Sequence, residues 1–236
     1  MSKRLENRVA LITGASRGIG AAVARRFSLE GAHPIVVART QGALEKLDDD
    51  IRTNGGAATL VPLDLLDGAA VDKMAGLIAE RFGKLDILVG NAAILGQLSP
   101  MSHYDPKTWT EVVATNLHAN WRLIRNFDAL LRQSDAGRAI FVTSSVARKT
   151  KAYWGPYAAS KAALEKMVRD WSLELKQTNV RANIIDPGRV RTNMRKQAYP
   201  GENSKELRSP ESITDSFVKL ASAQCESNGE IFFAYQ

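Results

Sequence analysis

The 236-residue chain is long enough for one large domain or two small ones, and its 44% of hydrophobic residues can bury a sizeable core. The net charge is +7, but the charged residues form no block of about five or six like charges and no basic stripe with interleaved aromatic residues. We therefore expect no nucleic-acid partner. No apolar run approaches the roughly 20 residues of a membrane-spanning helix, and the single cysteine, Cys225, excludes an intrachain disulfide and a thiolate metal cluster. Because the polar opening stretch lacks the cleavage site of a signal peptide, we expect a cytoplasmic protein with no membrane association and no metal.

Strand and helix patterns alternate along the whole chain. Short apolar runs predict strands over residues 9–12, 35–38, 58–63, 85–89, 139–142, 180–185 and 231–234. Apolar residues at helical spacing, with capping and stop signals, predict helices over residues 21–29, 44–51, 69–82, 105–132, 156–177 and 209–222. The unbroken alternation predicts an α/β fold, with a single Rossmann-type, doubly wound parallel sheet of about seven strands and helices on both faces. We expect one domain over residues 1–236, with a short substrate loop at about 189–208.

A glycine-rich loop, TGASRGIG at residues 13–20, joins the first expected strand to the first helix. Its glycines let the backbone turn tightly and approach a ligand closely, and the helix N-terminus offers N–H groups to a phosphate. The alternative is a plain tight turn between strand and helix. Ligands of parallel sheets bind at the carboxyl ends of the strands, so polar residues at those ends favour a ligand site. The chain places Arg39, Asp64, Asn91, Ser144 and the pair Pro187-Gly188 at such ends.

The end of the second strand indicates which dinucleotide would bind. An Asp or Glu there bonds the ribose 2′-hydroxyl and selects NAD, whereas a nearby arginine accommodates the 2′-phosphate of NADP. Here Ala38 stands in that place, Arg39 follows at once, and Arg17 lies in the glycine loop. Two guanidinium groups suit a dianionic phosphate, so the sequence favours NADP(H). The alternative is that both arginines are merely solvated.

Tyr157 and Lys161 are the candidate pair for proton transfer. If a helix begins at Pro156, they lie one turn apart on one face, and a neighbouring ammonium favours the phenolate over the phenol. Ser144 lies at the end of the preceding strand, where its hydroxyl would be beside the first turn of that helix. Such a set suits proton transfer to or from a carbonyl or alcohol oxygen. On its own, however, a Tyr-x-x-x-Lys pair is more often an ordinary half-exposed helix face.

A set of motifs occurs in one order along the chain. They are residues 13–20, Asp64, the Asn91-Ala92 turn, Asn116, Ser144, Tyr157, Lys161, Pro187-Gly188 and Thr192. In this pattern the sequence resembles the short-chain dehydrogenase/reductase family over nearly its whole length. Within that family, residues 64–66, 134–137, 154–157 and 191–195 are most similar to the bacterial YciK-type oxidoreductases.

The resemblance implies a role for each catalytic candidate. Tyr157 would be the general acid/base, and Lys161 would lower the pKa of Tyr157 and hold the nicotinamide ribose. Ser144, rather than Ser145, would orient the substrate carbonyl, and Asn116 would support a water-linked proton relay to Lys161. The implied cofactor-binding residues are Gly14, Ser16, Arg17, Gly18, Ile19, Gly20, Arg39, Asp64, Leu65, Asn91, Ala92, Tyr157, Lys161, Pro187, Gly188, Val190 and Thr192.

The sequence departs from the family pattern at Ala93, which puts a methyl group where the family's usual glycine lets the backbone run close to the cofactor. The segment after Thr192 is short, which argues against a deep cavity for a bulky substrate. The residues expected to shape the pocket suit many small carbonyls and are Ile94, Leu95, Met101, Val146, Tyr153, Trp154 and Met194.

The resemblance therefore implies an oxidoreductase that transfers a hydride between NADP(H) and a small carbonyl or alcohol substrate. The alternative is a catalytically silent dinucleotide-binding sensor or scaffold of the same fold. We also expect a homodimer or homotetramer that associates through the helices holding Asn116 and Tyr157.

Overall fold

The computed structural model describes residues 3–235, and its seven strands form one parallel sheet in the order β3-β2-β1-β4-β5-β6-β7, which confirms the predicted fold. The strands are β1 (Val9–Thr13), β2 (His33–Ala38), β3 (Thr59–Pro62), β4 (Ile87–Gly90), β5 (Arg138–Val142), β6 (Arg181–Asp186) and β7 (Ile231–Phe233). The α-helices are α1 (Gly18–Leu29), α2 (Gln41–Thr53), α3 (Gly68–Phe82), α4 (Pro106–Val113), α5 (Ala119–Arg132), α6 (Gly155–Glu174), α7 (Asn193–Ala198) and α8 (Thr214–Ala221). Within the described residues, none of these helices is long and apolar enough to cross a membrane.

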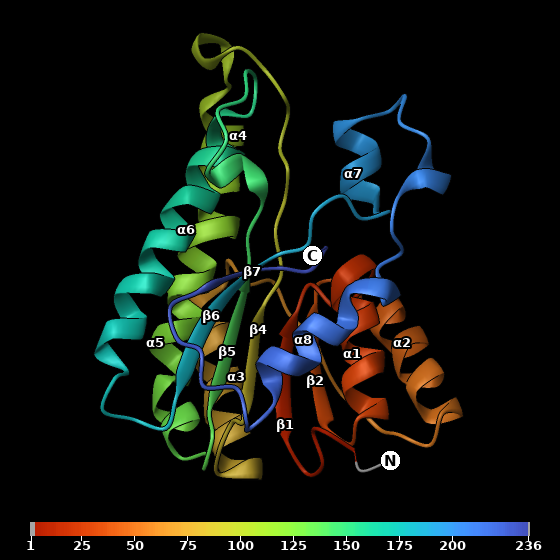
Figure 1. Cartoon of the computed structure of the whole chain (residues 1–236), viewed down its shortest axis with the longest axis vertical. Helices are drawn as coiled ribbons and strands as arrows, with labels where there is room; N and C mark the ends of the chain where they lie inside the picture. Colours follow the sequence, from red (N-terminus) through yellow and green to blue (C-terminus); the bar gives the residue numbers. More distant parts are fainter. Residues whose placement is uncertain (1–2, 236) are drawn as a thin grey trace.

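Each face of the sheet carries its own hydrophobic core, because alternate residues of a strand point to opposite faces. In β1, Ala10 and Ile12 belong to the core beneath α1, α2 and α8. Val9 and Leu11 belong to the core beneath α3, α5 and α6 on the other face. Figure 1 shows the two layers of helices on either side of the strands. A strand buried on both faces requires an unbroken apolar run, which is the signal that the sequence carries.

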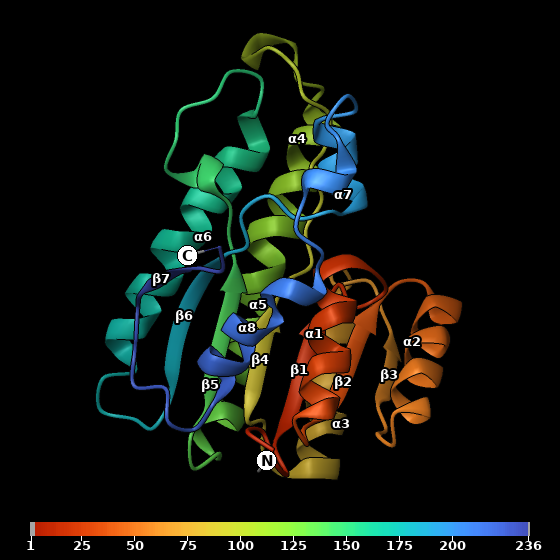
Figure 2. The same ribbon diagram turned by 45° about the vertical axis from the view of Figure 1, so that its right-hand side comes forward.

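The winding of the sheet reverses between β1 and β4. From β1 the chain proceeds outward to β2 and β3, and from β4 it proceeds in the opposite direction to β5, β6 and β7. At such a switch point the outgoing loops separate and leave a crevice at the carboxyl ends of the strands. Figure 2 shows that α7 lies at this end of the sheet, above α1 and β1.

The long helix expected over residues 105–132 changes its hydrogen bonding in the middle. A π-helical stretch, Ala114–His118, joins α4 to α5, and in it the Ala119 N–H donates to the Ala114 carbonyl. Asn116 lies in this stretch, and its carbonyl accepts a 2.8 Å hydrogen bond from the side chain of Asn120. Such insertions in α-helices are frequent at functional sites.

The substrate loop expected at residues 189–208 contains α7 and a 3₁₀ turn, Ser204–Glu206. Thr192 caps α7, because its Oγ1 accepts a 3.1 Å hydrogen bond from the Arg195 N–H. This cap lies four residues after Gly188. The segment that follows lies over the carboxyl end of the sheet (Figure 2).

Candidate active site

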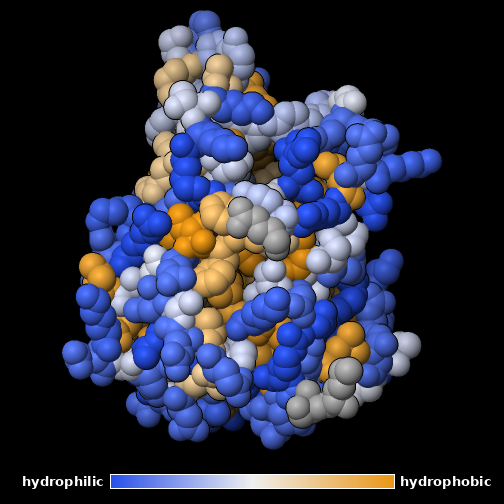
Figure 3. All heavy atoms as spheres, in the orientation of Figure 1, coloured by the Kyte–Doolittle hydropathy of each residue, from blue (hydrophilic) through white to orange (hydrophobic). Residues whose placement is uncertain are grey.

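A cleft of about 730 Å³ opens at the carboxyl ends of the strands. Figure 3 shows the surface hollowed between α7 and the upper ends of α4 and α6. The expected site residues that line it are Gly14, Ser16, Arg17, Gly18, Ile19, Arg39, Asp64, Leu65, Asn91, Ala92, Ser144, Tyr157, Lys161, Pro187, Gly188, Val190 and Thr192. Two others, Gly20 and Asn116, are buried behind its wall. The structure thus gathers residues from seven separate segments of the chain at one site.

The glycine loop folds tightly onto the end of β4. Gly14 has a φ of +65°, and a Cβ placed on Gly20 would lie only 2.4 Å from the Gly14 carbonyl oxygen. Asn91 fixes the loop, because its Nδ2 donates to the Thr13 carbonyl at 2.8 Å. The side chain of Arg17, at the N-cap of α1, forms no capping hydrogen bond. The first N–H groups of α1 therefore suit a ligand phosphate.

Replacing Gly20 with alanine is expected to lower stability by roughly 1–3 kcal/mol and to weaken dinucleotide binding, because the new methyl group would overlap backbone atoms of the loop. Thermal melting and a fluorescence titration with NADPH measure both effects. The matched control is Gly76→Ala on α3, where an added Cβ meets no heavy atom within 4 Å. Because alanine is a better helix former, the control should be more stable by about 0.5–1 kcal/mol. Unchanged melting and binding in Gly20→Ala would contradict the tight-loop interpretation.

Tyr157 lies in the first turn of α6 and is 7% exposed. Its ring meets Trp154 edge-on, with 5.8 Å between ring centres. Burial raises the pKa of Tyr157 to about 12, a hydrogen bond with Ser144 lowers it, and the charge of Asp186 raises it. The phenol is therefore protonated at neutral pH, and the Ser144 hydroxyl is close enough to affect its pKa.

Lys161 lies one turn further along α6 and is 1% exposed. Its Nζ donates a 2.7 Å hydrogen bond to the Val142 carbonyl and lies 5.9 Å from the centre of the Tyr157 ring. Burial lowers the pKa of Lys161 to about 8, and the charge of Glu165 opposes this change. Burial holds the pKa of Tyr157 above its usual value in this structure, and the expected lowering of that pKa by Lys161 stays a prediction.

Asn116 does not reach the cleft. Its Oδ1 accepts a 2.9 Å hydrogen bond from the Ile94 N–H, while its Nδ2 donates to the Ile94 carbonyl at 3.0 Å and to Ser160 Oγ at 3.1 Å. These bonds use both amide protons. The side chain therefore fixes the segment after β4 against α6, and the support of a water-linked relay to Lys161 stays a prediction.

An apolar cluster around Trp154 forms part of the cleft wall. Leu95, Trp154 and Met194 line the cleft together with Ile94, and Ala93 contributes the expected methyl group. Three residues expected in the pocket lie outside its lining: Met101 and Tyr153 are 67% and 60% exposed, and Val146 packs against the small cluster around Trp154. The aromatic ring of Trp154 also meets Tyr199 just beyond α7, at 5.9 Å between centres.

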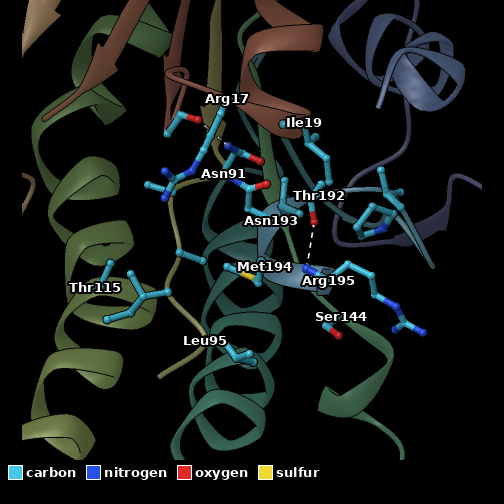
Figure 4. Close-up of a pocket in the computed structure, with 18 of the residues that line it drawn as sticks. Arg17, Ile19, Asn91, Leu95, Thr115, Ser144, Thr192, Asn193, Met194 and Arg195 are labelled. Carbon is cyan, nitrogen blue, oxygen red and sulfur yellow. Dashed lines mark hydrogen bonds between the residues drawn. The ribbon is translucent and has the colours of Figure 1, made fainter. Parts of the chain in front are cut away.

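The end of the cleft away from this cluster is basic and exposed. Figure 4 shows Arg17 and Asn91 at this end, away from Ser144 and Leu95. Arg39 lines it too, and its Nη1 lies 4.0 Å from a carboxylate oxygen of Asp64, with both side chains about half exposed or more. A glycine cradle that a Cβ would fill, a helix N-terminus and two accessible guanidinium groups fit a dinucleotide that carries an additional phosphate.

The sequence interpretation missed several cleft residues. Thr115, Arg191, Asn193, Arg195 and Gln197 also line it. The last four belong to the segment around α7, which the sequence marks only by its polar composition. Among the described residues, no cluster of three or more His, Cys, Asp or Glu side chains could hold a metal ion.

A parallel sheet whose cleft holds a half-buried Ser beside a buried Tyr and a buried Lys defines the class of protein. The chain belongs to the short-chain dehydrogenase family, whose model matches residues 8–203, and is thus an oxidoreductase of that family. It is 36% identical over 219 residues to the oxidoreductase YciK of Escherichia coli K12, covering 92% of this chain and 86% of YciK. It is 30% identical over 243 aligned positions to the 2,3-dihydro-2,3-dihydroxybenzoate dehydrogenase of Bacillus subtilis, covering 94% of this chain and 92% of that one.

Solved structures match the whole chain as well. A short-chain dehydrogenase from Escherichia coli CFT073 complexed with NADPH is 35% identical, with a TM-score of 0.96 and 100% of each chain covered. A structure of YciK from Escherichia coli is 34% identical, with a TM-score of 0.96, and the match covers 100% of this chain and 98% of that one.

Proposed function

We propose that this protein is an NADP(H)-dependent oxidoreductase that interconverts a small carbonyl compound and its alcohol. The observation that carries the proposal is the position of Ser144, Tyr157 and Lys161, which line one cleft with the glycine loop and two arginines. The similarity to a solved relative complexed with NADPH supports the same cofactor.

NADPH, when bound, supplies the hydride, and the side chains supply orientation and a proton. The Ser144 hydroxyl donates a hydrogen bond to the substrate oxygen and orients the carbonyl. Tyr157, protonated at neutral pH, donates its proton to that oxygen as negative charge develops there. Lys161 then stabilises the phenolate that forms, because its ammonium lies close to the ring. In alcohol oxidation the same groups act in reverse.

The two arginines support NADP(H) over NAD(H). No carboxylate follows β2 that would bond a ribose 2′-hydroxyl, since Ala38 and Arg39 stand there. Arg17 approaches the same end of the cleft from the glycine loop (Figure 4). Both guanidinium groups can form forked, charge-assisted hydrogen bonds with a phosphate.

The proposal is tested by NADPH-dependent turnover of a panel of small aldehydes, ketones and diketones, followed by NADPH absorbance. Turnover of one or more compounds with NADPH supports it. Binding of NADPH without turnover of any compound would instead favour the catalytically silent sensor or scaffold.

We further propose that the protein assembles as a homodimer or homotetramer. Large apolar side chains stay exposed on three neighbouring helices: Trp109 on α4, Trp121 on α5 and Leu173 on α6 are 37%, 48% and 59% exposed. Exposed apolar surface of this kind commonly marks an interface. Light scattering at micromolar concentration should give a multiple of the chain mass, and a monomer mass would refute this prediction.

A further inference from the structure

Arg191 is an exposed arginine that lines the cleft just before α7. Its backbone is fixed, because its N–H donates a 2.9 Å hydrogen bond to the Arg208 carbonyl and the preceding residue, Val190, forms a β-bridge with Arg208. Val190 is 3% exposed and belongs to the core beneath α1, α2 and α8. Since successive side chains of an extended segment point to opposite sides, the Arg191 side chain is directed away from that core and toward the cleft.

The neighbouring arginines have partners, whereas the Arg191 side chain forms no hydrogen bond or ion pair with any residue of 3–235. Arg189 lies 3.8 Å from Glu202, and Arg195 is paired with the same carboxylate. Arg208 donates hydrogen bonds to two backbone carbonyls that follow β7, at 3.3 and 3.0 Å. Within the part of the chain that the structure describes, the Arg191 guanidinium is therefore available to a ligand.

The segment that carries Arg191 lies against the N-terminus of α1. A Cβ placed on Gly18, the first residue of α1, would lie 3.4 Å from Cγ2 of Thr192. Figure 4 shows Thr192 at this start of α1, near Ile19. The N–H groups of the first turn of α1 are the donors that suit a ligand phosphate. Arg191 immediately precedes Thr192, so its long side chain is within reach of a phosphate held at these N–H groups.

The lining of the cleft leaves the charge of Arg191 unbalanced. Of the described residues that line the cleft, only Asp64 is acidic, and it lies 4.0 Å from Arg39. A bound dinucleotide brings a negatively charged pyrophosphate, which NADH and NADPH share, and a guanidinium forms forked, charge-assisted hydrogen bonds with phosphate oxygens. The alternative is that Arg191 is merely solvated, as exposed arginines commonly are. Its place beside the start of α1 favours the pyrophosphate.

We propose, on the basis of the cofactor named in the proposed function, that Arg191 binds the pyrophosphate of the dinucleotide from the side of α7, across from the glycine loop. In this arrangement Arg17 and Arg39 bind the 2′-phosphate, which only NADP(H) carries, and Arg191 binds the group that both cofactors carry. The two sets of arginines therefore have different signatures. Loss of Arg17 and Arg39 weakens the binding of NADPH, whereas loss of Arg191 weakens the binding of NADPH and NADH to the same extent.

The test is the affinity of the protein for NADPH and for NADH, measured by isothermal titration calorimetry without substrate. Arg191→Gln should raise the Kd of both cofactors by about tenfold, the lower end of the range for a charge-assisted contact, because the side chain is exposed. Thermal melting of this variant should stay at the wild-type temperature, since the side chain has no partner within residues 3–235. A Kd for NADH within about twofold of wild type would overturn the proposal.

Arg189→Gln is the matched control for the loss of one positive charge from this segment. Arg189 does not line the cleft, and its side chain is 75% exposed beside Glu202. Its loss should leave both Kd values within about twofold of wild type, because charges separated by solvent are screened. An equal weakening of both cofactors in Arg189→Gln and in Arg191→Gln would show a general effect of charge and overturn a specific contact of Arg191.

Two fragments of the cofactor separate the pyrophosphate from the other groups. ADP carries the pyrophosphate without the nicotinamide and without the 2′-phosphate, and 2′-AMP carries the 2′-phosphate without the pyrophosphate. Arg191→Gln should weaken the binding of ADP by about tenfold and leave that of 2′-AMP within about twofold of wild type, and Arg17→Ala with Arg39→Ala should do the reverse. Weaker binding of 2′-AMP with unchanged binding of ADP in Arg191→Gln would assign Arg191 to the 2′-phosphate and overturn the proposal.

These titrations separate the role of Arg191 from the proposed activity, because they need no turnover. If wild type binds both dinucleotides and reduces no carbonyl, the proposed activity fails, while the Kd values still decide the role of Arg191. If wild type is active and Arg191→Gln binds both cofactors as wild type does, only the role of Arg191 is refuted. A wild-type protein that binds neither dinucleotide would overturn both.

Discussion

Tyr157→Phe is expected to lower kcat for carbonyl reduction by about 10²–10⁴-fold, the usual contribution of a general acid, while NADPH still binds. The substitution removes the proton donor and keeps the buried ring that packs against Trp154. In free energy this corresponds to roughly 3–5 kcal/mol of barrier. Steady-state rates and a fluorescence titration with NADPH measure the two properties separately.

The matched control for this prediction is Tyr153→Phe. Tyr153 lies four residues earlier, is 60% exposed and does not line the cleft, so its loss should leave the rate near wild type. If Tyr157→Phe keeps more than about a tenth of the activity, its effect falls well below the acid–base range and the assignment is wrong.

Wild type is expected to prefer NADPH over NADH by more than about tenfold in kcat/KM, since each charge-assisted hydrogen bond to the 2′-phosphate contributes roughly 1.5–3 kcal/mol. The double variant Arg17→Ala with Arg39→Ala is expected to lose this preference. Both side chains are exposed, so solvent weakens each contact and the lower end of this range applies. The KM for NADPH should rise, while the KM for NADH should change little because NADH lacks the 2′-phosphate. Initial rates with both cofactors and any accepted carbonyl measure the ratio.

Arg25→Ala is the matched control, because it removes an arginine of α1 that does not line the cleft. Arg25 lies on α1, is bonded to Asp50 at 2.7 Å and is not part of the cleft lining. Its loss should leave the cofactor preference unchanged. Equal use of NADH by wild type, or an undiminished NADPH preference in the double variant, would contradict the phosphate assignment.

The fold follows from the sequence because the parallel strands are buried on both faces. The runs Val9 to Ile12 and Ile140 to Val142 are apolar without alternation. Asp105 marks the start of α4 because its side chain caps the helix, and Gly83 marks the end of α3 because it adopts a positive φ. The cleft residues could be predicted once the strands were known, because ligands of a parallel sheet bind at the carboxyl ends of its strands.

Other features depend on contacts that a local pattern does not encode. The π-helical stretch around Asn116 shifts a hydrogen bond by one residue, and this barely alters the apolar spacing of the helix that contains it. The pKa of Tyr157 depends chiefly on how deeply the phenol is buried. The pairing of Arg148 with Asp186 joins residues that are 38 positions apart in the chain.

The most direct test of the account is the fate of deuterium carried at both C4 positions of the nicotinamide ring of NADPH, during reduction of the carbonyl panel by the wild-type protein. For at least one compound, mass spectrometry should find the deuterium on the carbinol carbon of the product, in step with NADPH consumed, and Tyr157→Phe should slow its transfer by about 10²-fold or more. A protein that binds NADPH but transfers no deuterium to any compound of the panel would contradict the proposed oxidoreductase activity.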